Sequence, residues 1–392
     1  MTGRPNRHIG TFLLIVLGTV LALAGTDLVL PAVPGLPAIL GGDLPRAQMV
    51  LASFTAGSAV GLLLFGALGA RFDQRRLLAL SLLAYGLISA ACSMSNSINI
   101  LILLRFVQGA AGSAAAVFAP GLLRKLYGDG GAVGAMGLLG SIESLTPALA
   151  PLFGLWLLRL FDWRASFDLL AILSTALAAI VTARHRHLPP MRGLATGGGY
   201  WRLIADPCFM RYAISHACTL GALLIFVFGA PTVFTVTMGG TLSDFIIMQM
   251  TGIAFFIVIA NCSGALGRRF GDETMISIGT AIAAAGGVAM LAYAMAGGRS
   301  IHVVSALFPL LNTGLALRGP AGFHRAIVAA RGDDARGAAL VIVAILLTTS
   351  LGTAAVAPFI GLGLPALATG TALVAVAGLV SLALPKLERA AG

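Results

Sequence analysis

The chain has 392 residues, of which 58% are hydrophobic and 10% charged, with a formal net charge of +11 and a mean hydropathy of +0.97. Soluble domains carry roughly 25% charged and 45–50% apolar residues, so this composition excludes a soluble globular protein, a disordered chain and a disulfide scaffold. Long unbroken apolar runs also exclude a transmembrane β-barrel, whose strands alternate apolar and polar residues. The sequence therefore predicts an all-α polytopic membrane protein.

Twelve apolar runs follow one another along the chain. A hydrocarbon core of roughly 30 Å needs about 20 apolar residues for one helical crossing. Because backbone polar groups in lipid must be bonded within the segment, each run is predicted to form a transmembrane helix. The runs cover residues 11–33, 47–69, 77–94, 98–121, 133–158, 166–183, 210–236, 244–266, 275–296, 301–322, 337–361 and 364–384.

The distribution of positive charge predicts how these helices are oriented. With both termini in the cytoplasm, 19 of the 25 Lys and Arg residues fall in cytoplasmic segments and four in outer loops, and the opposite orientation reverses these numbers. Since basic residues gather on the cytoplasmic side, we expect both termini there. No nucleic-acid partner is predicted, because no basic stripe with interleaved aromatic residues is present.

Several kinds of chemistry have no motif in this chain. A G-x-x-x-x-G-K phosphate loop, which a single-chain ATP-driven pump requires, does not occur. Neither HExxH, GxSxG nor a Cys/His cluster points to an intramembrane enzyme or a metal site. No enzymatic activity, metal or cofactor is therefore predicted. The cysteines, Cys92, Cys208, Cys218 and Cys262, lie in or beside apolar runs and are expected to be buried and reduced.

An internal repeat divides the chain into halves. Residues 184–207 are basic and rich in Pro and Gly, which predicts a cytoplasmic linker between a six-helix bundle at 1–183 and a second at 208–392. The segment GALGARF at 66–72 returns as GALGRRF at 264–270, with six of seven positions identical. Two homologous halves are typical of transporters whose substrate site forms between them.

The segment between helices two and three resembles the G-x-L-x-D-R-x-G-R-R loop of the major facilitator superfamily. Matching positions are Gly66, Leu68, Arg71, Arg75 and Arg76. Ala70 replaces the usual Asp, and Asp73 replaces the second Gly. We expect Asp73 to supply the missing charge by pairing with one of these arginines.

Other segments resemble further superfamily motifs. In helix four, residues 105–109 (RFVQG) look like the R-x-x-Q-G signature with Arg105 and Gln108, and in helix five residues 147–154 are similar to the Pro-rich antiporter motif. Residues 26–32 (TDLVLPA) and 163–167 (WRASF) resemble segments of the bicyclomycin and chloramphenicol resistance (Bcr/CflA) branch of drug:proton antiporters. Pro147, Pro151 and Gly154 are expected to help the helices move against one another.

The resemblance spans essentially the whole chain and implies the superfamily fold of two pseudo-symmetric six-helix bundles. It also implies a monomeric secondary transporter of a bacterial inner membrane that exports lipophilic small molecules by alternating access, driven by the proton gradient. The sequence leaves alternatives open: a dedicated exporter of one endogenous metabolite, siderophore or peptide, a non-transporting sensor or enzyme, and an importer.

Ionisable residues inside apolar runs are functional candidates by default. Asp27 and Arg105 are expected at nearly the same depth, where they can pair across a cavity directly or through water. Glu143 lies ten residues into its helix, about 15 Å deep at 1.5 Å per residue. A buried carboxyl without a partner favours its neutral form, so Glu143 is a candidate proton carrier, and it becomes the better one if Asp27 pairs with Arg105.

These considerations define two sets of candidate residues. Proton coupling is assigned to Asp27, Glu143 and Arg105. The substrate cavity is assigned to Asp27, Glu143, Gln108, His216, Asn261 and Asn312. Arg318, near the inner end of helix ten, is expected to extend to the cytoplasmic surface, and His216 is also compatible with simple packing.

Overall fold

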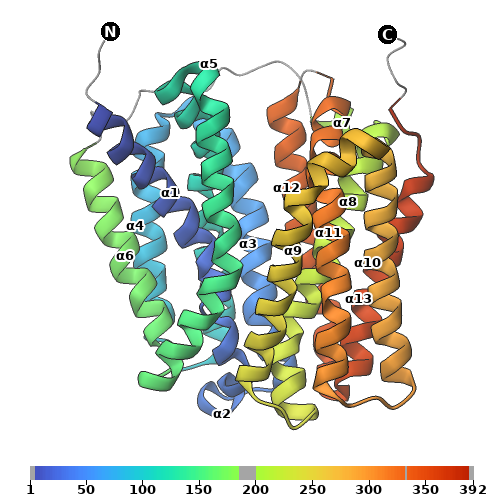
Figure 1. The fold of residues 1–392 in the computed structure, drawn as a ribbon. Coiled ribbons are helices and arrows are strands. Elements are labelled where there is room, and N and C mark those ends of the chain that lie inside the picture. Colours follow the sequence, from blue (N-terminus) through green and yellow to red (C-terminus); the bar gives the residue numbers. More distant parts are fainter. Residues whose placement is uncertain (1–4, 185–199, 332, 388–392) are drawn as a thin grey trace. The chain divides into compact units, whose positions relative to one another are not determined.

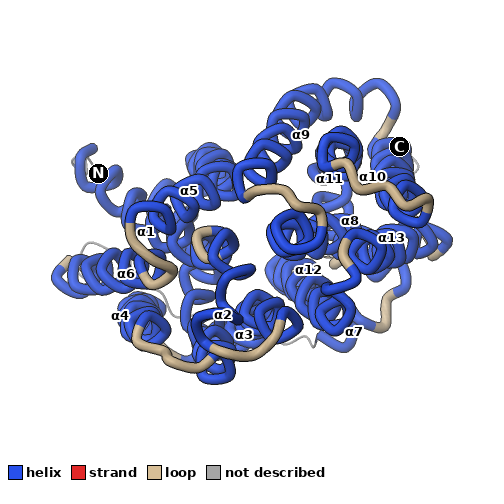
Figure 2. Tube along the Cα trace, turned by 90° about the horizontal axis from the view of Figure 1, so that it is seen from below, coloured by secondary structure: helices blue, strands red, loops and turns tan. Residues whose placement is uncertain are grey.

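The structure is a computed structural model that describes residues 5–184, 200–331 and 333–387. Throughout these ranges the regular structure is helical and no strand occurs (Figure 2). Twelve segments are long and apolar enough to cross a membrane, and each coincides with one of the twelve predicted runs. The chain clusters into two compact units, Met1–Thr196 and Gly197–Gly392.

Unit 1 contains six crossings (Figure 1). Its helices are α1 (Pro5–Asp27), η1 (Leu30–Gly35), α2 (Leu36–Leu40), α3 (Leu44–Arg71), α4 (Gln74–Ser93), α5 (Ile98–Leu160) and α6 (Ala165–Ala183). The long α5 covers two crossings, Ile98–Gly128 and Gly134–Leu160. The chain changes direction at Gly128, whose φ of 69° is a left-handed conformation that favours glycine.

Unit 2 contains the other six crossings. Its elements are α7 (Tyr200–Ile204), α8 (Pro207–Thr232), the π-helical turn η3 (Val233–Thr237), α9 (Leu242–Phe270), α10 (Asp272–Met295), α11 (Ile301–Ala329), α12 (Asp334–Val356), η4 (Ala357–Leu362), α13 (Leu364–Val380) and η5 (Ser381–Ala383). Most of α8 is buried, because α11, α12 and α13 pack around it.

Within the predicted linker, 184–207, residues 185–199 lie outside the described part of the chain. Residues 200–204 of the same segment form helix α7. The side chain of Arg202 in α7 donates a hydrogen bond to the backbone carbonyl of Ala330, just after α11, at 3.1 Å. This end of the predicted linker is therefore folded onto unit 2.

Glycines bring α3 and the first crossing of α5 into backbone contact. A Cβ atom at Gly57 or Gly61 would collide with the carbonyl oxygens of Phe106 or Ala110, and a Cβ at Gly109 with that of Phe54. Small residues four apart allow such close crossings in membranes, where dispersion contacts rather than water exclusion drive helix association. This contact fixes α5, and with it the polar residues of the R-x-x-Q-G segment.

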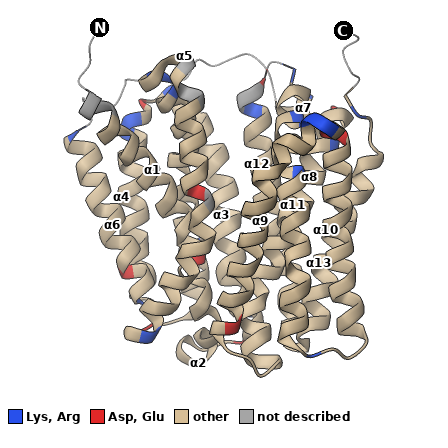
Figure 3. Cartoon of the chain, in the orientation of Figure 1, with Lys and Arg blue, Asp and Glu red and all other residues tan. Residues whose placement is uncertain are grey.

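Charged residues concentrate at the helix ends (Figure 3). In unit 1 the Lys and Arg residues lie mainly at the end where α1 begins, and in unit 2 at the end where α8 begins. The repeated heptapeptides lie at equivalent places, since 66–72 closes α3 and 264–270 closes α9. Each half therefore carries the same basic turn at the end of its second crossing.

A polar cluster ties the C-terminal segment to unit 2. Glu273, at the start of α10, accepts hydrogen bonds from the Tyr212 hydroxyl and from Arg211, both of α8. The Tyr212 hydroxyl also accepts a hydrogen bond from the Leu387 backbone amide at 3.1 Å, and Arg211 donates to the carbonyl of Leu384 at 2.9 Å. These bonds hold the chain after η5 against the end of α8.

Candidate substrate and proton site

The first crossing is interrupted at Asp27. Helix α1 ends at this residue, and 3₁₀ turn η1 follows with Pro31 and Pro34. Proline has no N–H, so Pro31 leaves the carbonyl of Asp27 without its helical donor. Helical structure resumes in η1 and α2 and continues to Leu40, seven residues beyond the predicted apolar run. Asp27 lies at a break within the segment, and such breaks in transporters are tolerated where the backbone is buried in protein or lines a cavity.

The backbone freed by this break is bonded to a neighbouring helix. The amide of Ala32 bonds to the carbonyl of Val29 rather than to that of Leu28. The Leu28 carbonyl instead accepts a hydrogen bond from the Ser166 hydroxyl of α6 at 3.1 Å. A Cβ at Gly154, in the second crossing of α5, would collide with this same oxygen. The break is therefore supported by specific contacts from α5 and α6.

Arg105 of α5 lies fully buried beside the break. Its Nη1 donates to the Gly25 carbonyl of α1 at 3.0 Å and to Gln108 Oε1 at 2.7 Å, and its Nε donates to the Val50 carbonyl of α3 at 3.3 Å. The guanidinium carbon is 4.0 Å from the centre of the Phe54 ring, a cation–π distance. A buried cation is costly unless it is solvated by protein groups. Here neutral oxygens bond to Nη1 and Nε and an aromatic ring faces the guanidinium, while Nη2 has no hydrogen-bond partner among the described residues.

Gln108 connects Arg105 to a fourth segment of unit 1. Its amide nitrogen donates to the Ser89 hydroxyl of α4 at 2.7 Å, and Ser89 in turn donates to the Tyr85 carbonyl. The Tyr85 hydroxyl donates to the Leu21 carbonyl of α1 at 3.2 Å. The network thus joins α1, α3, α4 and α5, and it holds the last turn of α1 two residues before Asp27.

In the described part of the chain, Arg105 and Asp27 form no ion pair. The Arg105 guanidinium donates to the carbonyl of Gly25. Asp27 is half-buried at the end of α1, two residues further along the chain. A direct pairing is therefore absent, and the backbone carbonyl of Gly25 in α1 accepts from the guanidinium instead. Asp27 keeps a carboxylate that no described side chain neutralises.

Glu143 is half-buried in the second crossing of α5 and interacts with the side chain of Thr19 in α1. The Thr19 hydroxyl itself lies buried and bonds to the Val16 carbonyl. Thr19 and Asp27 are eight residues apart on α1, about 12 Å along the axis. Both intramembrane carboxylates of unit 1 therefore lie beside α1. Asp27 is at the broken end of this helix, and Glu143 of α5 is next to Thr19, about two turns closer to the start of α1.

The predicted motif residues of helix five have distinct environments. Pro151 and Gly154 are buried and Pro147 is half-buried in the second crossing of α5. Gly154 is the residue that allows close approach to the broken first crossing. The absence of a side chain at this position is therefore a steric requirement of the local packing.

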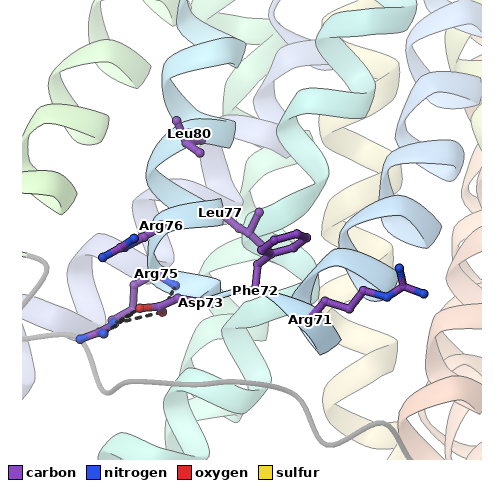
Figure 4. A pocket seen from close by; sticks show the side chains of 7 residues that line it. All are labelled: Arg71, Phe72, Asp73, Arg75, Arg76, Leu77 and Leu80. Atoms are coloured by element: carbon purple, nitrogen blue, oxygen red, sulfur yellow. Dashed lines mark hydrogen bonds and ion pairs between the residues drawn. The ribbon is translucent and has the colours of Figure 1, made fainter.

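The loop between α3 and α4 forms an open basic cavity of about 500 Å³ (Figure 4). Asp73 is the N-cap of α4, where its carboxylate accepts from the Arg75 amide at 3.0 Å and pairs with the Arg75 side chain at 2.7 Å. The hydrogen bonds from Arg75 hold the pKa of Asp73 below its usual value. Arg71 and Arg76 are exposed on either side (Figure 4). Of the three arginines predicted as partners, Arg75 is the one that forms an ion pair with Asp73. Gly66, the first residue of the motif, is half-buried about one turn before the end of α3.

The cavity candidates of unit 2 are not gathered in one place. Asn261 is exposed on α9 and bonds to its own helix, at the Ile257 carbonyl. Asn312 is buried on α11 and lies against Gly252 of α9. His216 is buried on α8, with its ring 6.0 Å from that of Phe323.

Two expectations about buried groups are wrong. Arg318 does not extend to the surface but is 0% exposed, with Nη2 bonded to the Ser215 hydroxyl of α8 at 2.9 Å. Depth along a helix suggested the surface, whereas the direction of the side chain around α11 faces α8. Cys262 is exposed, while the other three cysteines are buried.

The residues that complete the Arg105 network are not among those predicted from the sequence. Ser89 and Tyr85 stand four residues apart on α4, a spacing that places both on one helix face. Two polar residues at this spacing in an apolar run were the signal in the sequence that could have indicated a polar contact between helices. Gly25 and Val50 contribute backbone carbonyls, for which the sequence carries no signal at all.

Comparison with known proteins gives a consistent result. The family model described as Major Facilitator Superfamily matches residues 15–327. The chain is 28% identical over 283 residues to the chloramphenicol resistance protein of Pseudomonas aeruginosa, covering 71% of this chain and 67% of that protein. It is 26% identical over 286 residues to a bicyclomycin resistance protein homolog of Haemophilus influenzae, covering 71% and 72%.

Solved structures share the fold. A peptide transporter of the POT family, described as auto inhibited, aligns over 98% of both chains with a TM-score of 0.74 at 14% identity. A bacterial homolog of the lysosomal transporter Spinster aligns over 97% of this chain and 96% of its own with a TM-score of 0.70 at 16% identity. The predicted fold and the predicted resemblance to the resistance branch are confirmed by these comparisons.

Proposed function

Because the chain belongs to the Major Facilitator Superfamily of membrane transporters, we propose that it exports lipophilic small molecules across a bacterial inner membrane in exchange for protons. It is a multi-pass membrane protein and a transporter rather than an enzyme. In this proposal both termini face the cytoplasm, and the monomer is the working unit. The proton gradient drives transport, without a metal or organic cofactor.

The observation that carries the proposal is the placement of two carboxylates in unit 1. Among the described crossings, Asp27 and Glu143 are the acidic residues that lie away from the ends of their segments. Intramembrane acidic groups of this kind mark proton relays and substrate pathways. The names of the two relatives, which refer to resistance against chloramphenicol and bicyclomycin, support drug-like molecules as the substrate class.

In the proposed cycle a carboxylate alternates between binding a proton and supporting the substrate. One carboxylate cannot do both at once, so proton binding lowers the affinity for substrate in the state that opens outward, and this differential affinity drives export. Arg105 acts as a positioning residue, because it bonds to Gly25 and so fixes the turn of α1 that carries Asp27. Alternation between the six-helix bundles at 1–183 and 208–392 would expose the site to each side in turn.

The test is proton release from acid-loaded inverted vesicles on addition of single compounds. The panel contains amphenicols, lipophilic cations and zwitterions. Wild type, Asp27→Asn and Glu143→Gln are compared with Asp168→Asn, a control that neutralises an exposed carboxylate in the first turn of α6. We expect release by several unrelated compounds, retained in the control and lost in at least one of the two intramembrane variants.

Two results would contradict the proposal. If both intramembrane variants release protons like wild type, neither carboxylate couples transport to protons. If a folded wild-type protein responds to no compound on the panel, multidrug export is wrong. A response to one endogenous metabolite, siderophore or peptide alone would indicate a dedicated exporter.

A further inference from the structure

Unit 2 contains a second buried cationic cluster, separate from the Arg105 network. It consists of Arg318 on α11 with Ser215 and His216 on α8. Arg318 is 0% exposed and His216 is 7% exposed. The one hydrogen bond of the Arg318 side chain within the described residues runs from Nη2 to the Ser215 hydroxyl, at 2.9 Å.

Three nitrogen atoms of this cluster have no hydrogen-bond partner in the described part of the chain. They are Arg318 Nε, Arg318 Nη1 and His216 Nδ1. Arg318 always carries its proton, so two of the three are obligatory donors. His216 becomes a third donor in the tautomer that carries hydrogen on Nδ1.

No described carboxylate compensates this charge. Ion pairs of unit 2 involve other arginines, near the ends of the helices. The titratable group that acts electrostatically on His216 is Arg318, and the one that acts on Arg318 is Cys218. An isolated charge in an apolar interior is far more costly than a paired one, so the cluster requires an acceptor from outside the described residues.

The backbone around the cluster holds the guanidinium in place. Helix α10 packs against the backbone of Arg318, because a Cβ at Gly279 of α10 would lie 2.9 Å from the Arg318 amide nitrogen. On the α8 side, a Cβ at Gly322 would lie 2.8 Å from Arg318 Nη2 and 3.6 Å from His216 Nδ1. The guanidinium of Arg318 and the ring of His216 therefore both lie against the backbone of Gly322, with no side chain of that residue between them.

We propose that Arg318, His216 and Ser215 bind an anionic group, such as the carboxylate of a transported molecule. A carboxylate oxygen accepts hydrogen bonds from a guanidinium in strong, charge-assisted geometry. Ser215 orients the guanidinium through Nη2, and His216 adds a donor from the same helix. As a substrate contact, this inference rests on the proposed function and extends the substrate class to compounds that carry a carboxylate, zwitterions included.

A bound inorganic anion such as chloride would satisfy the same donors. The two sources share the anionic chemistry and differ in size and in what they imply for transport. Direct binding to the purified full-length protein in detergent distinguishes them without any proton-flux assay. The probes are sodium benzoate, its neutral analogue benzamide, and chloride added to a low-chloride buffer.

The variants are Arg318→Met, which keeps an apolar stem without charge, and Gly322→Ala, which places a methyl group beside Nη2 and Nδ1. Arg268→Gln, which removes an exposed arginine near the end of α9, is the matched control. We expect saturable binding of benzoate but not of benzamide, with the dissociation constant raised at least tenfold in both cluster variants and unchanged in the control. Since Arg318→Met removes a charge without a counter-charge, we expect it to fold with undiminished thermal stability.

Saturable chloride binding that depends on Arg318, without benzoate binding, would assign the site to an inorganic anion. Absence of binding by both anions, or binding that Arg318→Met leaves unchanged, would overturn the proposal and leave ordered water as the acceptor. These outcomes are separate from the proposed function. Export of a neutral amphenicol with no anion binding would refute the anion site alone, and anion binding without any proton-linked flux would refute the proposed function alone.

Discussion

Substitution of Gly154 by alanine tests the close contact that supports the broken first crossing. The added methyl group would collide with the Leu28 carbonyl oxygen, a backbone atom that cannot move aside as a side chain does. Overpacking of this kind costs about 1–3 kcal/mol. A weakened Ser166 to Leu28 hydrogen bond, now 3.1 Å long, adds about 1 kcal/mol.

Alanine also gains helix propensity over glycine, by up to about 1 kcal/mol. The matched control is Gly140→Ala, in the same crossing of α5, because no atom lies within 4 Å of a Cβ at that position. We therefore expect Gly154→Ala to lower the free energy of unfolding by about 1–3 kcal/mol, and Gly140→Ala to leave it unchanged or raise it slightly.

Reversible unfolding of the purified protein in mixed micelles measures this difference. We expect the transport rate to be lower in Gly154→Ala than in Gly140→Ala, because Leu28 is the residue after Asp27 and a displaced Leu28 carbonyl also moves the Asp27 carboxylate. Equal stability of the two variants would show that α5 does not contact the break as described. A destabilised Gly154→Ala protein with full transport would show that this packing contact stabilises the fold but does not position Asp27 for transport.

Three further perturbations test other parts of the structure. Gln108→Leu removes the side-chain acceptor of Arg105, and we expect a loss of about 2–4 kcal/mol in the same unfolding measurement, since one charged and one neutral hydrogen bond disappear. Asp73→Asn keeps a capping residue but loses the ion pair with Arg75, so we expect a cost under about 1 kcal/mol at neutral pH. Because the pKa of Asp73 is lowered in the folded protein, its stabilising effect is complete above the ordinary Asp pKa and is lost as the pH falls through the folded value. Melting curves of both proteins should therefore converge under acid conditions, and a gap that persists would contradict the pairing. Tyr212→Phe removes the hydroxyl that accepts from the Leu387 amide, and hydrogen exchange of that amide should accelerate while that of α13 remains unchanged.

The number and order of the crossings were readable from the sequence because they depend on a local property. An apolar run of the right length must form a helix in lipid, whatever its neighbours are. The superfamily resemblance was readable for a related reason, since its motifs are short and continuous. The two intramembrane carboxylates, Asp27 and Glu143, were identified by the same local rule, that a charge in an apolar run needs an explanation.

Only the tertiary structure decided which groups these charges meet. Arg105 bonds to carbonyl oxygens of Gly25 and Val50, and every residue of the chain carries such an oxygen, so the sequence could not single them out. Arg318 was expected at the surface because its depth along α11 is local, whereas its burial depends on its direction toward α8, which the packing of other helices fixes. Hydrophobic length is set within each segment, but the partner of a buried charge is set by contacts between segments that are distant in the chain.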